Sequence, residues 1–520
     1  MSGAASIAPG SFESILYPSG TARDGARPRD DADVLRDLNL DQVIAAAGAE
    51  CKDYDLTEYF HTPLADFDAV TYRQEVVRDL ESTPIMEAVE AFAERMHRMR
   101  ALTALAAKLD YPHERRRRLL GAAQAYGEAM TGLADRLANL ELRSRGMRAL
   151  RAYLADYVHG AAFGGFASDL RAVLEALSGV RYAVMIRGLS VAVRPPGGEP
   201  DYSAEIEATF ERFRRAPARD YRAKLVDAGR LNHVEAQILE RVALLNPEPF
   251  SALETFCEAH ETYLDARVVR FDREVQFYVA YLRFVAPLRA AGLAFCQPVL
   301  SADTGEIAIR GAFDLALAAT LAAHGETPVR NDLALSAADR IIVVTGPNHG
   351  GKTTFARMIG QLHYLAGLGL PVPGTEARLA LVDRVFVHFE RVEDIRNLRG
   401  KLYDDLVRIR RILDAATADS LIILNEVFAS TTIGDALDLS RKLLARVSRL
   451  GCLAVCVTFL DELASFDERT VSVVGAVNKA DPSVRTFRFE RRPADGLAYA
   501  VAIAEKYRVT QDWLLRRIRP

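Results

Sequence analysis

The spacing of hydrophobic residues changes along this chain of 520 residues and predicts two kinds of structure. From about residue 36 to 292, apolar residues recur every three or four positions, as in 85–109 and 119–142, which predicts a mainly α-helical core or lever domain. From about 293 to 520, short apolar runs alternate with helical stretches, which is typical of an α/β domain with a mainly parallel sheet. Residues 1–35 are rich in Ser, Gly, Ala and Pro, and we expect them to form a disordered leader.

One segment of the helical region has a β-like pattern instead. Residues 182–193 read YAVMIRGLSVAV, and the sequence Pro-Pro-Gly-Gly at 195–198 closes them as a turn. We therefore expect a small β insertion near 181–200 within the helical domain.

The composition is that of an ordinary globular protein, with 50% hydrophobic and 26% charged residues. The net charge of -4 comes from 66 basic and 70 acidic residues, so there is no general positive field. Any contact with nucleic acid must come from local basic patches.

The cysteines and the lengths of the apolar runs indicate the cellular compartment of the protein. The five cysteines form no C-x-x-C pair, and Cys452 and Cys456 lie in an apolar stretch that favours a strand interior over metal ligands. No apolar run approaches the roughly 18 residues of a membrane span, and the N-terminus lacks a signal pattern. We expect a cytoplasmic protein with reduced thiols and no membrane partner.

A glycine-rich loop directly follows the apolar run Ile341–Val344. It reads TGPNHGGKTT from Thr345 to Thr354 and satisfies G-x-x-x-x-G-K-[ST] between a strand and a helix. In such a loop the main-chain N–H groups face a phosphate, Lys352 reaches the β- and γ-phosphates, and the Thr353 hydroxyl ligates Mg²⁺. The candidate nucleotide-binding residues are Gly346, Pro347, Asn348, His349, Gly350, Gly351, Lys352, Thr353 and Thr354.

A second apolar run, Leu421–Leu424, ends in Asn425 and Glu426. It predicts a buried strand that delivers polar side chains to the phosphate end of the sheet. Asn425 carries no charge but accepts a hydrogen bond from a Mg²⁺-bound water, and Glu426 is placed to act as the general base. An ordinary strand end is the alternative interpretation.

Three hydroxyl residues, Ser430, Thr431 and Thr432, precede a predicted helix. Thr432 and Asp435 have capping-box spacing, so one interpretation is a capped helix and nothing more. The other is that this helix N-terminus meets the γ-phosphate held by a second subunit.

These motifs resemble those of the MutS ATPases. TGPNHGGKTT is similar to the family's TGPNMGGKST, and NEVFASTTIGDAL at 425–437 is similar to its DE-x-GRGTST-x-DG-L block. Residues 399–405 resemble the intervening G-x-S-x-F-x-x-E segment, and 331–333 match the family's entry into its nucleotide domain. The resemblance extends over about residues 55–515 and is strongest in the α/β domain.

The resemblance implies an ABC-like P-loop ATPase that uses ATP and Mg²⁺ and dimerises head to tail, with two nucleotides enclosed between subunits. By position, Asn348 would help to hold the γ-phosphate, and it completes a catalytic set with Lys352 and Glu426. Residues 430–432 would act in trans. His349 stands where the family usually has Met, and we interpret it as a variable loop residue, with a phosphate contact as the alternative.

Three departures from the family pattern predict slow hydrolysis. Asn425 replaces an Asp, Phe459 stands where a switch His follows Thr458, and Phe428 and Ala429 replace a glycine–arginine pair. Loss of single electrostatic contributors of this kind lowers turnover by about 10²–10³-fold. The resemblance to the helical core starts near residue 55, so we also expect no N-terminal mismatch-reading domain.

Our first hypothesis is a homodimeric clamp on mismatched, branched or distorted DNA, acting with repair or recombination partners. The second is a nucleotide-gated scaffold for a protein partner, and the third, a chromosome-organising or transporter-type ABC ATPase, is disfavoured because no LSGG-type signature is present. DNA would contact the helical domain through phosphates, since the basic clusters lack interleaved aromatic residues. The candidate residues are Arg115, Arg116, Arg117 and Arg118; Arg143, Arg145, Arg148 and Arg151; and Arg212, Arg214, Arg215, Arg219, Arg222 and Lys224.

Overall fold

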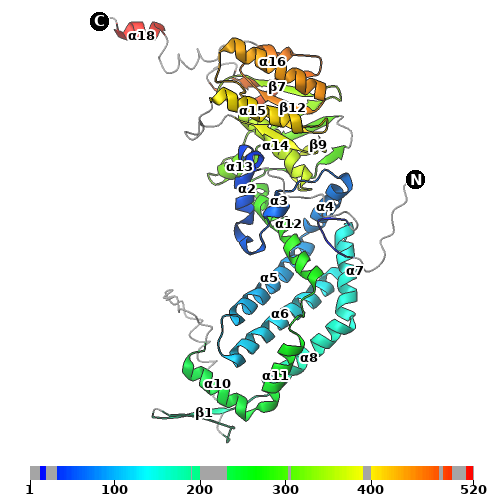
Figure 1. The fold of residues 1–520 in the computed structure, drawn as a ribbon, viewed down its shortest axis with the longest axis vertical. Helices are drawn as coiled ribbons and strands as arrows, with labels where there is room; N and C mark the ends of the chain where they lie inside the picture. The colour runs from blue at the N-terminus through cyan, green and yellow to red at the C-terminus, as the bar shows by residue number, and fades with distance from the viewer. Residues whose placement is uncertain are drawn as a thin grey trace, which may run out of the picture. The chain divides into compact units, whose positions relative to one another are not determined.

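The computed structural model describes residues 12–18, 32–188, 190–198, 231–301, 306–389, 400–478, 484–494 and 511–518. Within these ranges the chain forms two compact units. The first comprises Thr83–Leu142 and Ala149–Asp272, and the second comprises Phe12–Ser82, Arg143–Arg148 and the chain from Arg273 onward. Figure 1 labels the elements of both units.

The first unit is mainly helical. The long helices α5 and α6 pack side by side (Figure 1). Pro112 begins α6 at a position where a missing N–H costs nothing, and a capping box of Asn232 and Glu235 begins α10. Its helices are α5 (Thr83–Ala106), α6 (Pro112–Ala138), α8 (Ala161–Ser178), α10 (His233–Leu245) and α11 (Pro247–Ala259), with most of α7 (Arg145–His159) and the start of α12 (Ala266–Ala290).

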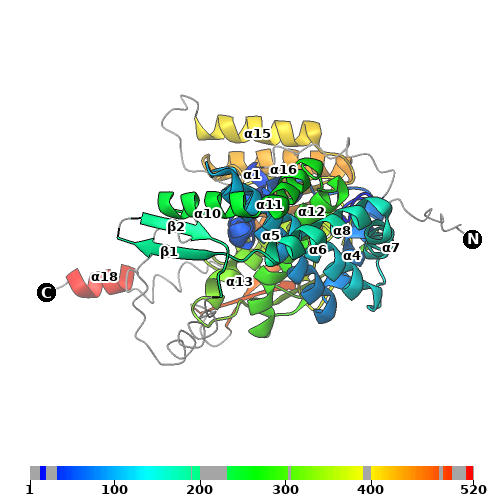
Figure 2. The same cartoon turned by 90° about the horizontal axis from the view of Figure 1, so that it is seen from below.

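A β-hairpin lies in the first unit where the sequence predicts a β insertion. Strands β1 (Ala183–Arg187) and β2 (Ser190–Arg194) pair antiparallel, with Ile186 opposite Val191. The hairpin lies beside α10 (Figure 2).

A six-stranded sheet forms the centre of the second unit. Its strand order is β10 (Val385–His388), β11 (Leu421–Asn425), β12 (Leu453–Val457), β7 (Ile341–Thr345), β13 (Thr470–Val477) and β14 (Arg485–Arg491). The first five strands are parallel, and β14 is antiparallel to β13. Every residue of β7, β11 and β12 is buried because helices cover both faces of the sheet.

The covering helices follow directly from the sequence pattern. On one face, α15 (Lys401–Ala415) and α16 (Ile433–Leu450) pack Ile409 and Leu444 into a core with alternate strand residues. On the other face lies α14 (Lys352–Gly367), whose Gly360 approaches so closely that a Cβ there would be 2.6 Å from Ile423 (Figure 1). Helix α14 thus begins at the phosphate loop and packs closely against the sheet.

Smaller elements complete the second unit. A four-stranded sheet has the order β4 (Val299–Ser301), β9 (Glu376–Ala380), β5 (Ile307–Ala312), β6 (Asn331–Leu335), and β3 (Phe295–Cys296) pairs with β8 (Val372–Pro373). The remaining helices are α1 (Ala32–Asp37), α2 (Leu40–Ala47), α3 (Thr57–Phe60), α4 (Phe67–Leu80), α13 (Leu315–Ala322), α18 (Gln511–Ile518) and 3-10 turns at Gly48–Glu50, Lys52–Tyr54 and Asp461–Ser465.

The units divide the chain differently from the boundaries that the hydrophobic pattern predicts. Residues 32–82 share helical periodicity with the helical unit, yet they belong to the unit with the sheet. The main-chain oxygens of Asp37 and Leu38 accept hydrogen bonds from Arg357 and Gln361 of α14, at 3.1 and 2.8 Å. Periodicity reports which face of a helix is buried, but it does not report against which element.

The expected disordered leader does not hold for residues 12–18 and 32–35. Phe12, Ile15 and Leu16 are at most 2% exposed, and Val34 and Leu35 are buried in α1. Residues 1–11 and 19–31 lie outside the described part of the chain. The prediction was wrong for residues 12–18 and 32–35 because the high Ser, Gly and Pro content of the region outweighs a short cluster of apolar residues in the composition.

Cys456 lies inside β12, opposite Val343 of β7 and Leu424 of β11. Burial raises the pKa of its thiol to about 12. Among the described helices, none combines the length and apolarity needed to cross a membrane.

Candidate nucleotide site

The loop between β7 and α14 has a backbone that its glycines make possible. Gly346 has φ 121°, and a Cβ there would lie 2.9 Å from the main-chain nitrogen of Gly475 in β13. Gly351 has φ 88° and caps the N-terminus of α14. Both conformations are costly for any residue with a side chain. The loop therefore turns tightly and presents main-chain N–H groups at the positive end of a long helix.

The middle of the loop is equally constrained. A Cβ at Gly350 would lie 2.8 Å from the carbonyl oxygen of Pro347. His349 is exposed and adopts φ 57°, so its side chain lies outside the packed loop. Pro347 is buried, whereas Asn348 is exposed.

Lys352 lies within the loop that precedes it. Its Nζ donates to the carbonyl oxygens of Gly346 and Pro347 at 3.1 and 3.3 Å and to Oδ1 of Asn348 at 3.3 Å. The side chain is 5% exposed, and burial lowers the pKa of the ammonium, with Glu426 opposing that shift. A buried ammonium held mainly by neutral acceptors favours an anionic ligand.

Thr353 and Asn425 meet across the site. The Thr353 hydroxyl, in the first turn of α14, donates to Oδ1 of Asn425 at the end of β11 across 3.0 Å. The two strands involved, β7 and β11, are separated by β12, and their carboxyl ends share one edge of the sheet. Hydroxyl and amide oxygens are ligands that Mg²⁺ accepts, so this pair fits the ion that the sequence predicts.

The chain after β11 contains two residues with positive φ, Glu426 at 50° and Phe428 at 63°. The Glu426 N–H donates to the carbonyl oxygen of Val457 at 2.9 Å, which fixes the turn, and Glu426 lines the same cleft as the phosphate loop. Phe428 stands where the MutS pattern has glycine, and its buried ring packs in the core beneath α16. Backbone strain of this kind clusters at functional sites.

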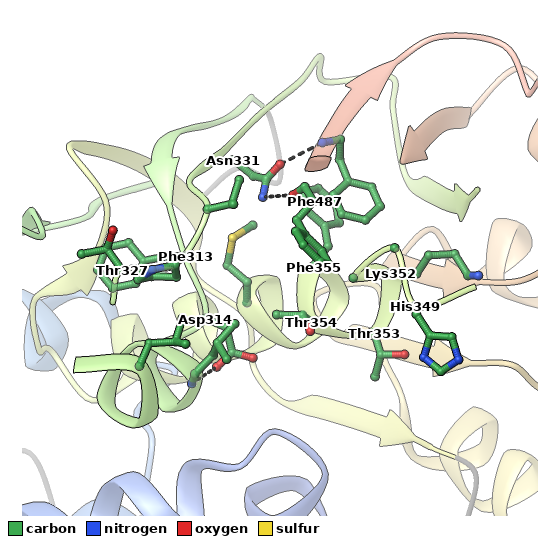
Figure 3. Close-up of a pocket in the computed structure, with 18 of the residues that line it drawn as sticks. Phe313, Asp314, Thr327, Asn331, His349, Lys352, Thr353, Thr354, Phe355 and Phe487 are labelled. Carbon is green, nitrogen blue, oxygen red and sulfur yellow. Dashed lines mark hydrogen bonds between the residues drawn. The ribbon is translucent and has the colours of Figure 1, made fainter. Parts of the chain in front are cut away.

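A cleft of about 820 Å³ opens beside the loop (Figure 3). Such a volume suits a ligand of nucleotide size. One end has the polar residues 348–354 and Glu426, and the other end is largely apolar. The apolar end is lined by Phe313, Leu317, Met358, Phe487 and Phe489.

Asn331 holds the apolar end together. Its Nδ2 donates to the carbonyl oxygen of Phe487 at 3.1 Å, and its Oδ1 accepts from the N–H of Phe489 at 2.9 Å (Figure 3). Phe487 adopts φ 55°, and Phe489 stacks on Phe355 of α14 with ring centroids 4.5 Å apart. Sequence reasoning identified Asn331 only as part of a motif and missed Phe313 and Phe487, because these residues come from three distant segments.

The hydroxyl triplet lies elsewhere on the same domain. The Thr432 hydroxyl accepts from the N–H of Asp435 at 3.2 Å and donates to Oδ2 of that residue at 2.8 Å, so it caps α16. Ser430 and Thr432 are exposed, Thr431 is partly exposed, and none of the three lines the cleft. Phe459 is also exposed, at 47%.

Several arginines of the predicted basic clusters are already paired within their own unit. Arg116 pairs with Glu254, Arg118 with Glu114 at 3.9 Å, and Arg145 with Glu75 at 3.1 Å and Asp68 at 2.7 Å. Arg115, Arg117, Arg143 and Arg148 are exposed, and Arg151 donates to the carbonyl oxygen of Leu140. The cluster at 212–224 lies outside the described residues.

Comparison with known proteins agrees with this geometry. The family model of MutS domain V, a P-loop ATPase domain, matches residues 342–511. The chain is 27% identical to the DNA mismatch repair protein MutS of Synechococcus sp. (strain WH7803), over 77% of this chain and 46% of that protein. The MutS proteins of Brevibacillus brevis and Granulibacter bethesdensis are 25% and 28% identical, over 66% and 58% of this chain and 40% and 32% of their own length.

The sheet order, the phosphate loop and the family match define a P-loop ATPase domain of the ABC-like class. Residues 342–511 match MutS domain V, and the chain is similar to curated MutS proteins over 58–77% of its length, which agrees with the resemblance of its motifs. The chain spans about half, or less, of the length of these curated relatives.

Proposed function

We propose that this protein is a slow MutS-type ATPase that works as a homodimeric clamp on mismatched, branched or otherwise distorted DNA in the cytoplasm, in repair or recombination. The observation that carries the proposal is that Lys352 and Thr353 line one end of the cleft and that the Thr353 hydroxyl there contacts Asn425. The other end of the cleft supplies an apolar surface for a nucleotide base.

The roles of the residues follow from their positions. Lys352 and the N–H groups of the loop bind the β- and γ-phosphates of ATP, and Asn348 orients the γ-phosphate. Thr353 and Asn425 hold Mg²⁺, which when bound neutralises charge on the phosphates. Glu426, in the same cleft, orients and polarises the attacking water.

A second copy would complete the site. Ser430, Thr431 and Thr432 are at least partly exposed, lie at the N-terminus of α16 and have no contact with the cleft of their own chain. The exposed side chains of Ile433, at 70%, and Phe459 give that surface an apolar part. Closing the dimer therefore brings hydroxyls and a helix N-terminus to the γ-phosphate of the partner subunit.

The catalytic part is tested with Glu426→Gln. We expect loss of turnover, retained binding of a fluorescent ATP analogue, and an ATP-dependent dimer that light scattering detects. Glu468→Gln, which removes an exposed acid of the same domain, serves as the matched control. Unchanged turnover in Glu426→Gln would remove Glu426 from the role of base.

The DNA part is tested by affinity for mismatched, four-way, flap and single-stranded DNA, with and without ATP, at two salt concentrations. Affinity for distorted DNA should fall steeply with salt and respond to ATP. Arg115→Ala with Arg117→Ala should weaken binding and reduce the salt slope by about 2, because both side chains are exposed. Absence of DNA binding at low salt would instead support the scaffold function.

A further inference from the structure

Residues 12–17, which we name the N-terminal latch, form no helix or strand, yet they are buried in the second unit. Phe12 is 2% exposed, and Ile15 and Leu16 are 0% exposed. Within the latch, only Glu13 is exposed. A segment of this kind has to find partners for its main-chain polar groups outside regular secondary structure.

The N–H groups of the latch donate to side chains. The Ile15 N–H donates to Oε2 of Glu274 at 2.9 Å, and the N–H groups of Leu16 and Tyr17 donate to Oγ of Ser14 at 3.0 and 3.1 Å. The Ser14 hydroxyl in turn donates to Oε2 of Glu274 at 2.9 Å. The Ser14 hydroxyl and the Ile15 N–H thus join the latch to the Glu274 carboxylate of α12, while the two bonds that Ser14 Oγ accepts fix the turn of the latch itself.

The carbonyl groups of the latch are bound in the same way. The carbonyl oxygens of residues 14, 15 and 16 accept from Tyr72 Oη, Tyr278 Oη and Arg73 Nε at 2.8, 2.9 and 3.1 Å. These donors belong to α4 and α12. The side chains of α4 and α12 thus bind three consecutive carbonyl groups and one N–H group of a segment that bends at residues 15–17, which is characteristic of a site that binds a peptide.

Two buried charges line this groove. Arg73 and Glu274 are both 0% exposed, and the Arg73 guanidinium lies 5.0 Å from the ring centroid of Tyr17 and 5.5 Å from that of Phe277. Buried charges are tolerated when hydrogen bonds compensate them, and the latch supplies several of these bonds. The groove is therefore built around an occupant.

The same arginine reaches the helix that begins at the phosphate loop. Arg73 Nη1 donates to the carbonyl oxygen of Leu368, the C-cap of α14, at 3.4 Å. Gly369 follows with φ 75°, and a Cβ there would lie 2.5 Å from Cβ of Arg73. Arg73 consequently bridges the latch to the carboxyl end of α14, whose first residue is Lys352.

We propose that the N-terminal latch is a separable peptide ligand of the α4–α12 groove, and that its occupancy fixes the carboxyl end of α14. The site accepts a bent apolar segment, supplied by this chain itself, with a hydroxyl residue placed like Ser14 to close the bend. Its effect on the nucleotide site rests on the proposed ATPase function, whereas the binding of the peptide does not.

The test uses the full chain with a protease site introduced at residues 20–27, cut after folding. A fluorescent peptide of residues 12–18 should exchange into the cut protein, as measured by anisotropy, and unlabelled peptide should compete. Ser14→Ala in the peptide should weaken binding at least about tenfold, because it removes a hydrogen bond to the buried Glu274 carboxylate and the two bonds that hold the bound turn of the peptide. Glu13→Ala is the matched control and should bind within about twofold of the natural peptide, because Glu13 is exposed.

Absence of exchange in cut protein that circular dichroism shows to be folded overturns the proposal, as does equal binding of the Ser14→Ala peptide. A non-hydrolysable ATP analogue should slow the exchange at least about fivefold if the groove and the nucleotide site are coupled. An unchanged exchange rate overturns the coupling. If the fluorescent ATP analogue does not bind at all, the proposed ATPase function is excluded. Peptide exchange measured without nucleotide then still tests whether the latch is a separable ligand.

Discussion

The hydroxyl of Thr353 donates a hydrogen bond to Oδ1 of Asn425 across 3.0 Å, which joins the first turn of α14 to the end of β11. This contact places a neutral amide where the MutS pattern has a carboxylate. In the proposed ATPase, we therefore expect the charge of the side chain at 425 to set the affinity of the site for Mg²⁺.

Asn425→Asp should raise Mg²⁺ affinity and ATP turnover, since it adds a negative charge at an oxygen already in contact with Thr353. Magnesium titrations of fluorescent ATP binding and steady-state hydrolysis measure the two effects. Thr353→Ser keeps the hydroxyl and serves as the control, whereas Thr353→Ala should lower both quantities. A drop in both for Asn425→Asp would show that the site is adapted to the amide.

Gly346→Ala should abolish ATP binding and lower the free energy of unfolding by more than about 2 kcal/mol. The φ of 121° is strained for alanine, and its Cβ would lie 2.9 Å from the nitrogen of Gly475. Urea unfolding and binding of the fluorescent analogue measure these effects. Gly434→Ala, in α16 with nothing within 4 Å of the added Cβ, should instead stabilise by about 0.5–1 kcal/mol.

Asn331→Ala should lower the free energy of unfolding by about 1–3 kcal/mol, because it leaves the main-chain groups of Phe487 and Phe489 without their partner. ATP affinity should fall as well, since the apolar end of the cleft loses its fixed wall. Calorimetric titration and urea unfolding measure the two effects. Arg330→Ala, at the neighbouring residue, removes only an exposed hydrogen bond to the carbonyl oxygen of Gly292 and should have a smaller effect on both quantities; an equal effect of both variants would argue against the role of Asn331.

His363 makes stability depend on pH. It is 2% exposed in α14, its Nδ1 contacts the carbonyl oxygen of Ile359 at 2.9 Å, and burial lowers its pKa from 6.5 to about 4. Because the unfolded chain binds the proton more readily, the free energy of unfolding falls as pH decreases from 6.5 to about 4, by up to about 1.4 kcal/mol per pH unit.

Urea unfolding of His363→Leu between pH 7 and pH 4 checks this slope. The variant should show a smaller loss of stability over that interval than the wild type. The exposed His324, which lies in the same unit, gives the control substitution His324→Leu. An identical pH dependence in His363→Leu and the wild type would exclude His363 as the source.

The positions of the loop between β7 and α14 and of Asn425 at the end of β11 could be predicted, because each is a local pattern at the end of an apolar run. The cleft wall of Phe313, Asn331 and Phe487 could not be predicted in this way, since spacing within a segment does not report which distant segments meet. The burial of the N-terminal latch could not be predicted for a different reason. Its few apolar residues lie among Ser, Gly and Pro, and their burial depends on side chains of α4 and α12 rather than on any periodicity of their own.

Cys456 has a practical consequence for measuring local opening. Its thiol lies in β12 between the strands that deliver the phosphate loop and Asn425, and its raised pKa keeps it protonated near neutral pH. Its side chain packs in the core beneath α15 and α16, so alkylation at this position requires these helices to move away from the sheet first, and its rate counts openings of this core in the protein without an added label.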